Sequence, residues 1–247
     1  MAITILYYHR VGPPRTGLPR KGFVTPESFR AQMAWIRRSG WQVLELDDYV
    51  DQLSRGGKLP RRGILITLDD GFADCRKYAV PVLEEFGIPA TFFVVSGAVG
   101  GTDHWNPTHK TFPEPLLGWK DLRLLRRSGF TIGSHTASHR RLAGLTVEET
   151  WKELAGSKAR LEEQLGCPVR HLAYPQGNWS PGIAALVREA GYASACSTRS
   201  GAVRDGRPDR YALPRVPVSA NDSIVAFAGK LLKGAIGVYD WRAQAQG

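Results

Sequence analysis

GILITLDDG, at residues 63–71, joins a β-prone apolar run to two adjacent acids and a glycine. A short apolar run that ends in polar and turn residues is typical of a buried strand. The same arrangement recurs along the chain, where apolar runs alternate with amphipathic helical stretches. Glycines stand directly after those stretches, where a left-handed residue commonly ends a helix: Gly40, Gly87, Gly129, Gly166 and Gly191.

The alternation predicts a single domain, residues 1–247, built on a parallel sheet or barrel. A chain of 247 residues is long enough for one α/β barrel of the usual size. We expect strands at residues 3–8, 41–44, 64–68, 90–95, 130–133, 171–174, 192–197 and about 211–218. We expect helices at residues 26–39, 46–53, 73–86, 119–127, 147–165 and 181–189.

Composition narrows the classes of partner. The formal net charge is +10, which suits an Arg-rich solvated surface, an anionic glycan, a phospholipid surface or nucleic acid. The basic residues are scattered and no nucleic-acid-binding motif is recognisable, so nucleic acid is the weakest of these partners. The three cysteines form no CxxC pair, which predicts buried reduced thiols. No signal segment or membrane-spanning run is recognisable, so we expect a cytoplasmic protein, with peripheral membrane association as an alternative. No feature specifies an oligomeric state.

Asp69 and Asp70 follow an apolar run directly, and burial there requires that they be paired or bind a cation. Neighbouring residues of a strand point to opposite faces, so the two acids do not suit the facing carboxylates of a glycosidase. One acid that binds a metal while the other acts as a base fits the spacing better. The alternative is that one aspartate caps the next helix.

His135 and His139 follow the predicted strand 130–133 at a spacing of four residues. Two imidazoles at this spacing share one face of a helical turn and are able to bind one ion. The alternative is two unrelated polar histidines. It is weakened because the pair follows a strand and the chain holds only six histidines.

These motifs resemble those of the polysaccharide deacetylase family, also known as the NodB homology or carbohydrate esterase 4 group. The matching segments are LITLDDGFADC, GSHTASHRRL and HLAYPQG, and the likeness extends over about residues 3–218. The opening LYYHRVG resembles the start of the permuted subgroup that deacetylates poly-N-acetylglucosamine. The resemblance implies a distorted, incomplete (β/α) barrel, seven-stranded and TIM-like, with its site at the carboxyl ends of the strands.

The resemblance also implies a role for each motif residue. One divalent metal would be bound by Asp70, His135 and His139. Zn²⁺ is the expected ion, with Co²⁺, Ni²⁺ or Mn²⁺ as alternatives. Asp69 would be the general base that deprotonates the attacking water, and the backbone N–H of Gln176 would stabilise the oxyanion.

Two departures from the family pattern require substitutes elsewhere in the chain. Ala173 stands where the family usually has the arginine that orients the base, and Arg215 is our candidate replacement, with a surface arginine as the alternative. No histidine follows His171, although the family usually supplies its general acid from a C-terminal histidine. His9, at the end of the first predicted strand, is our candidate acid, with a structural histidine as the alternative.

Substrate contacts are expected from Tyr174, Pro175 and Trp179, and Trp105 is a further aromatic candidate; core packing is the alternative for each. An amphipathic helix at about 221–240 is expected to pack on the barrel or, alternatively, to dock on a membrane. The resemblance implies a hydrolase that removes an N-acetyl group from an amino sugar of a polysaccharide or glycoconjugate. The alternatives are a deformylase or O-acetyl esterase acting on a free or lipid-linked sugar, and an inactive glycan-binding module.

Overall fold

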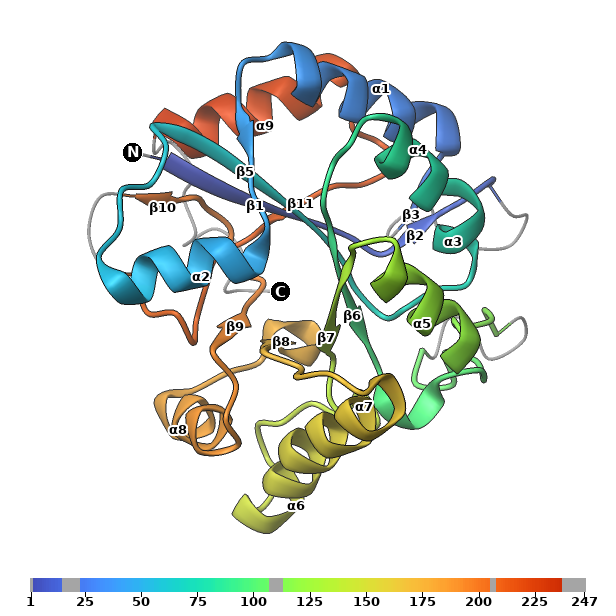
Figure 1. Ribbon diagram of the computed structural model, residues 1–247, viewed down its shortest axis with the longest axis vertical. Helices are drawn as coiled ribbons and strands as arrows, with labels where there is room; N and C mark the ends of the chain where they lie inside the picture. The colour runs from blue at the N-terminus through green and yellow to red at the C-terminus, as the bar shows by residue number, and fades with distance from the viewer. Residues whose placement is uncertain (1, 15–22, 107–112, 205–207, 237–247) are drawn as a thin grey trace.

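The centre of the molecule is a curled sheet whose parallel strands alternate with helices along the chain (Figure 1). The computed structural model describes residues 2–14, 23–106, 113–204 and 208–236. Within these residues, seven parallel strands lie in the spatial order β11 (Val216–Pro217), β1 (Ala2–Tyr8), β5 (Arg62–Leu68), β6 (Thr91–Val94), β7 (Thr131–Ser134), β8 (His171–Ala173) and β9 (Ser194–Cys196). This arrangement confirms the predicted incomplete α/β barrel.

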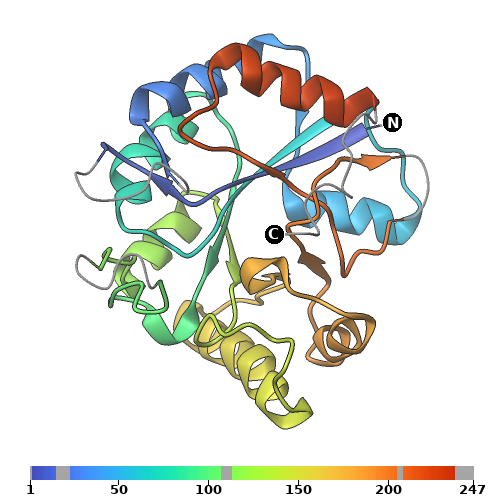
Figure 2. The ribbon, with the colours of Figure 1, turned by 180° about the vertical axis from the view of Figure 1, so that it is seen from behind.

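Helices surround the sheet on its outer side, as the view from behind also shows (Figure 2). Each predicted helical stretch contains helix, and the observed bounds are α1 (Pro26–Arg38), α2 (Leu46–Arg55), α3 (Asp74–Tyr78), α4 (Val80–Glu85), α5 (Trp119–Arg127), α6 (Val147–Trp151), α7 (Ser157–Leu165), α8 (Pro181–Glu189) and α9 (Ile224–Ile236).

Two predicted helices are interrupted. The stretch 73–86 is divided at Ala79 into α3 and α4, because Pro81 near the start of α4 has no N–H to continue the preceding hydrogen-bond ladder. The stretch 147–165 contains a π-helical segment, Lys152–Gly156, between α6 and α7. Such segments are short, and they are frequent at functional sites.

Helix α9 lies beside α1 on the outside of the sheet (Figure 1). Its Phe227 is fully buried and meets Trp35 of α1 edge to face, with ring centroids 6.0 Å apart. This contact supports packing on the barrel for the predicted C-terminal helix, whose residues 237–240 lie outside the described residues. No helix in the described part of the chain has the length and apolar character needed to cross a membrane.

The strands have two buried faces, as expected for parallel strands enclosed on both sides. One face packs against the outer helices. The other forms a separate cluster, which α2 joins and whose strand members include Ile3, Ile5, Leu65, Phe93, Ala173 and Cys196. Because side chains alternate along a strand, Tyr7 and Thr67 share this second face with Ile5 and Leu65. Near the carboxyl ends of β1 and β5, this face therefore carries Tyr7 and Thr67.

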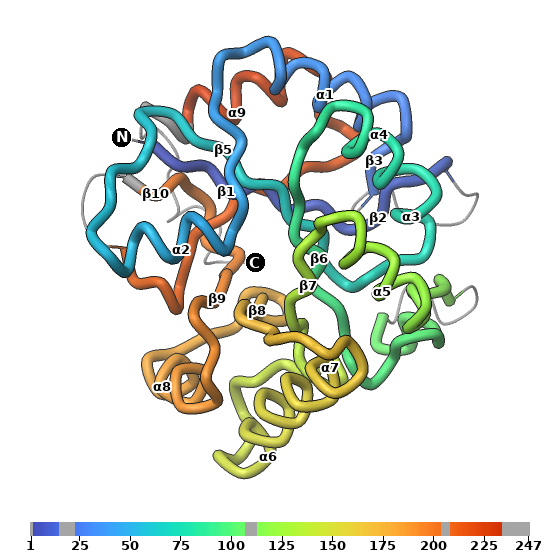
Figure 3. The backbone as a smooth tube through the Cα atoms, in the orientation of Figure 1, coloured from blue at the N-terminus to red at the C-terminus, as the bar shows by residue number. Residues whose placement is uncertain are grey.

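The segment that ends in β11 contacts both β9, at one edge of the sheet, and β1, on the other side. Leu213 forms a parallel bridge with Cys196 of β9, and Val216 pairs with Leu6 of β1. The backbone path in Figure 3 follows this return from the last strands to the first. Arg215, between the two contacts, is fully buried as a result.

Short pairings complete the sheets: β10 (Val203–Arg204) runs antiparallel to β1, β4 (Gln42–Val43) pairs with β5, and β2 (Arg10–Val11) pairs with β3 (Phe23–Val24). The strand predicted at residues 41–44 contains β4, whereas β2, β3 and β10 are too short for their periodicity to be recognised in the sequence. The three cysteines are free, as predicted, but Cys167 is only partly buried.

Candidate metal and catalytic site

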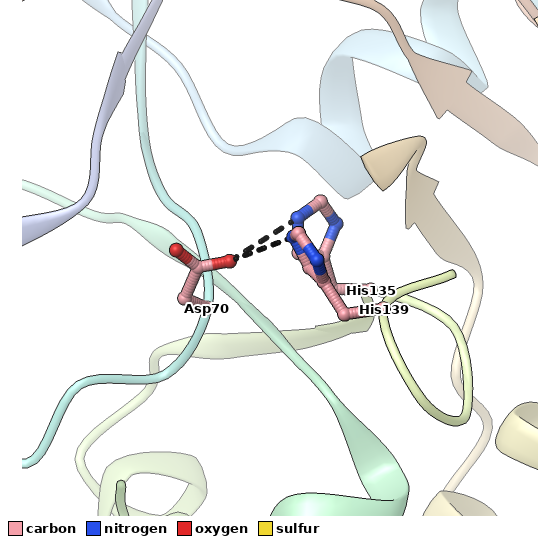
Figure 4. A group of neighbouring side chains, drawn as sticks. All are labelled: Asp70, His135 and His139. Carbon is pink, nitrogen blue, oxygen red and sulfur yellow. Dashed lines mark ion pairs between the residues drawn. The ribbon is translucent and has the colours of Figure 1, made fainter. Parts of the chain in front are cut away.

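Three side chains converge at the carboxyl end of the sheet, after β5 and β7 (Figure 4). Asp70 follows β5, His135 follows β7, and His139 lies in the loop after His135. One potential ligand atom from each residue lies within 4.8 Å of the others. The parallel register of the sheet brings these residues together, because the ends of β5 and β7 flank the end of β6.

The geometry of this group fits a divalent metal ion. Asp70 Oδ1 lies 3.4 Å from His135 Nε2 and 3.3 Å from His139 Nε2. Ligands at about 2.0–2.1 Å from one tetrahedral ion would lie about 3.3 Å apart. Asp70 Oδ1 is also a buried oxygen without a hydrogen-bond partner among the described residues, which is costly unless a cation is bound.

The ring of His135 is oriented by a neighbouring strand. Its Nδ1 lies 2.7 Å from the carbonyl oxygen of Ala173 in β8, so this nitrogen is the donor and Nε2 is directed toward Asp70. Metal-binding histidines characteristically use their second nitrogen in this way. Burial lowers the pKa of His139 against the opposing attraction of Asp70, which favours a neutral imidazole that is able to bind a cation.

The backbone is left-handed at three residues of the site, with φ of 69° at Asp70, 67° at Thr136 and 60° at His139. Residues other than glycine adopt this conformation at a cost, and it is concentrated at functional sites. The amides of Ser96 and Gly97 hold the loop by donating to the carbonyls of Thr136 and Ala137 at 3.1 and 2.8 Å.

Asp69 is buried inside the incomplete barrel, where it is paired with Arg215. Nη1 and Nη2 of Arg215 donate to Oδ1 and Oδ2 of Asp69 at 2.8 and 2.7 Å. Nη1 also donates to Thr67 Oγ1 and Nε to the carbonyl of Ser197. The guanidinium carbon lies 4.6 Å from the centroid of the Tyr7 ring. The structure thus places Arg215 in contact with the predicted base, and not at the surface.

The charges around the two acids keep both ionised. Burial raises the pKa of the Asp69 carboxyl, but Arg215, with smaller contributions from His135 and His9, holds it below its usual value. Burial likewise raises the pKa of Asp70, and the interactions with the three histidines hold it well below the usual value. Asp69 is therefore able to accept a proton at neutral pH.

His9 follows β1, at the same end of the sheet as Asp70, His135 and His139. It is partly buried and meets Tyr7 edge to face, with ring centroids 5.6 Å apart. Its backbone carbonyl accepts a hydrogen bond from Cys75 Sγ at 3.2 Å. The structure brings His9 close enough to influence the ionisation of Asp69 and Asp70, and its role as general acid stays a prediction.

The residues of the HLAYPQG segment are divided between core and surface. The Tyr174 ring is fully buried and its hydroxyl donates to the carbonyl of Tyr211 at 2.9 Å, so it packs in the core and does not offer a face to a sugar. Pro175 is also buried. Gln176 is exposed and left-handed (φ 55°), and Trp179 is partly exposed beneath the guanidinium of Arg199. Substrate contact by Trp179 and oxyanion binding by Gln176 stay predictions.

Two further residues touch the site. Trp105 is partly buried and stacks on the ring of His139, with centroids 4.7 Å apart and planes at 21°, so it contacts one of the candidate metal ligands. Glu153 binds the backbone between His135 and His139. Its sequence signal is a charge within the buried stripe of a helix, beside Leu154, where an acid needs partners.

Comparison with known proteins agrees with this site. A family model described as polysaccharide deacetylase matches residues 56–195, which include Asp69, Asp70, His135 and His139. The chain belongs to the polysaccharide deacetylase family. Membership confirms the predictions of a carbohydrate deacetylase and of a hydrolase, in a family that depends on a metal.

Relatives in this family match most of the deacetylase chain. It is 29% identical over 226 residues to a Bacillus subtilis protein assigned to the polysaccharide deacetylases, covering 91% of this chain and 74% of the relative. It is 24% identical to a poly-beta-1,6-N-acetyl-D-glucosamine N-deacetylase of Staphylococcus aureus, covering 79% and 68%. The structure of IcaB from Ammonifex degensii superposes with a TM-score of 0.77 at 26% identity, covering 93% and 97%.

Proposed function

We propose that this deacetylase hydrolyses the N-acetyl group of an amino sugar in a polysaccharide or glycoconjugate. Asp70, His135 and His139 would hold one divalent metal, with Zn²⁺ as the first choice for a site of one carboxylate and two imidazoles. When bound, the ion supplies positive charge that polarises the amide carbonyl and favours deprotonation of water. The observation that carries the proposal is the ionised, arginine-paired Asp69 directly beside this group.

Two residues of the chain would carry out the proton transfers, one as base and one as acid. Asp69 accepts the proton of the attacking water, while Arg215 holds its carboxylate ionised and in one orientation. His9 donates a proton to the leaving nitrogen. The backbone N–H of Gln176 donates to the oxygen that becomes negatively charged, as in other acyl-transfer sites. Trp179 offers a partly exposed aromatic face for a sugar ring.

The substrate class rests on the similarity to named relatives. The Staphylococcus aureus relative carries the name of an N-deacetylase of an N-acetylglucosamine polymer, and similarity to it extends over 208 residues. An N-acetylated glycan is therefore the expected partner. Attraction to an anionic glycan or to a membrane surface through the net charge of +10, and a cytoplasmic location, stay predictions.

The test is acid release by the metal-loaded protein from matched N-acetyl, O-acetyl and N-formyl sugars. We expect the wild-type protein to release acetate from the N-acetyl sugars. Asp69→Asn is the matched control and should release little or none. Release from the O-acetyl sugars alone would identify an esterase, and formate alone would identify a deformylase. Glycan binding without any acid release would identify an inactive binding module.

A further inference from the structure

Glu153 binds the short loop that joins the two metal-binding histidines. Its Oε2 accepts hydrogen bonds from the backbone amides of Ala137 and Ser138 at 3.0 and 2.9 Å. Its Oε1 accepts from the hydroxyl of Ser138. The side chain is 7% exposed, so these partners compensate a nearly buried carboxylate.

The π-helical segment Lys152–Gly156 places Glu153 against this loop. The backbone carbonyl of Glu153 also accepts from the amide of Ala137, at 3.1 Å. In a continuous α-helix this carbonyl would be committed to the residue four positions on. A π-helical turn disturbs that ladder, and here both the carbonyl and the carboxylate of Glu153 bind the loop.

The loop is thereby held from two opposite sides. The amides of Ser96 and Gly97, at the end of β6, bind its carbonyls, and Glu153 binds its amides. The backbone is left-handed at Thr136, where the anchored stretch begins, and at His139, directly after it. A strained conformation persists only where its surroundings determine it, so loss of one anchor should let the loop relax and displace His139.

We propose that Glu153 is a positioning residue that fixes His139 relative to His135 and so sets the metal affinity of the site. The proposal rests on the metal site of the proposed function and adds a residue to which the sequence motifs assign no role. Partners that orient metal ligands typically contribute about 10–100-fold to affinity. Glu153 acts through the loop: within the described residues its carboxylate binds Ala137 and Ser138 and makes no hydrogen bond to either histidine ring.

The test separates hydrogen bonding from space filling. Glu153→Gln keeps both the shape and an acceptor oxygen, and its amide is able to donate to Ser138 Oγ. Glu153→Met keeps a similar length and removes the acceptors. Glu148→Met is the matched control, since Glu148 lies on the same helical stretch, is exposed, and pairs only with exposed Lys152 in the recorded contacts of the described residues.

Zn²⁺ affinity is measured by competition with a chromophoric chelator, and the visible spectrum of the Co²⁺-loaded protein reports the coordination geometry. We expect Glu153→Met to weaken Zn²⁺ binding by about 10–100-fold and alter the Co²⁺ spectrum. We expect Glu153→Gln to stay much closer to wild type, and Glu148→Met to match it. Equal affinities in wild type and Glu153→Met, or equal losses in the Gln and Met variants, would overturn the proposal.

Ser138→Ala is a milder second variant that removes one contact to Glu153, in case Glu153→Met does not fold. A rise in the Zn²⁺ dissociation constant supports the proposal, and an unchanged constant contradicts it. These measurements need no substrate, so they are independent of the reaction. A wild-type protein that binds Zn²⁺ tightly but releases no acid would contradict the proposed function. It would not contradict the role of Glu153, which is judged from Zn²⁺ affinity alone.

Discussion

Arg215 holds both carboxylate oxygens of Asp69 in a fork of two hydrogen bonds, at 2.8 and 2.7 Å, where neither side chain is more than 3% exposed. Two parallel N–H···O bonds fix the plane of the carboxylate as well as its charge. Asp69 follows β5 and Arg215 immediately precedes β11, so the pair links the two sides of β1. The resemblance led us to expect an arginine at the position of Ala173 in β8, and the guanidinium is supplied instead by Arg215, directly before β11.

Arg215→Lys should lower kcat by about 10–100-fold, because a lysine is a point charge that cannot form the fork. The pKa of Asp69 should rise, since Arg215 holds it below its ordinary value. The acidic limb of the pH profile of kcat/KM should therefore move to higher pH. The measurement is a pH–rate profile with Zn²⁺ content determined in parallel. The control is Arg210→Lys, at a partly exposed arginine that donates to Ser54 Oγ. A profile that matches wild type would contradict the orienting role.

Arg215→Ala should also reduce the free energy of unfolding, by about 3–5 kcal/mol, because removal of one member of a buried ion pair leaves the other charge uncompensated. The double variant Arg215→Ala with Asp69→Asn should recover part of this loss. Denaturant unfolding of the two single variants and the double variant measures the coupling. Strictly additive losses would show that the two side chains do not stabilise each other.

Asp69→Asn should keep the metal and lose most turnover. The asparagine retains the shape of the side chain but cannot accept a proton, and a general base contributes about 10²–10⁴-fold to rate. His135→Ala should lose both metal and turnover, because it removes a ligand. Metal content after dialysis and acetate release are measured together. Full activity in Asp69→Asn would refute its assignment as the base.

The sequence predicts this site because its residues lie at the ends of recognisable strands. The apolar run before Asp69 and the strand before His135 specify the edge of the sheet on which they meet. Side chains alternate along β5, so Asp69 is expected on the same inner face as Leu65 and Thr67, as observed. The burial of Arg215 was harder to predict, since it depends on the pairing of Leu213 with β9 and the strand that follows Arg215 has only two residues.

Other features depend on tertiary contacts that leave little trace in a sequence. The left-handed backbone at Thr136 and the π-helical turn at Glu153 stabilise each other through hydrogen bonds between segments. Local propensity favours an ordinary helix at both ends of that turn. The aromatic ring of Tyr174 was expected to contact a sugar, but the strand ending at Ala173 carries it into the core. Residue type alone does not distinguish a sugar platform from a core aromatic.

His9→Ala should lower kcat while the Zn²⁺ content stays unchanged, because His9 lies outside the metal-binding group. A general acid contributes about 10²–10⁴-fold to the rate, and its loss should change the pH–rate profile. His104→Ala is the control, since His104 is exposed, with Nδ1 3.2 Å from the Thr102 carbonyl oxygen and its ring edge to face with Trp105. An unaltered pH profile in His9→Ala would refute the role of His9 as the acid.

A second charged group joins α2 to the start of β8, at the opposite end of the strands from Asp70 and His135. His171 is fully buried, and its Nε2 lies 3.1 Å from Asp47 Oδ1 while its Nδ1 lies 2.9 Å from Ser194 Oγ. Arg170 donates to Asp47 at 2.6 Å and also binds Asp51. The hydrogen bond from His171, against the opposing effect of burial and aided by Arg170, lowers the pKa of Asp47 to about 2.

This group should make the stability of the fold depend on acid pH. The pKa of Asp47 is about 2 in the folded chain and about 3.9 in an unfolded one, so its contribution is complete above about pH 4 and is lost as the pH falls toward 2. Asp47→Asn should be less stable than wild type at pH 6, and this difference should shrink over that acid window. Unfolding by urea between pH 2 and 6 measures it, with Asp48→Asn, an exposed neighbour, as the control. A difference between wild type and Asp47→Asn that stays constant from pH 6 to pH 2 would show that the carboxylate of Asp47 does not stabilise this junction.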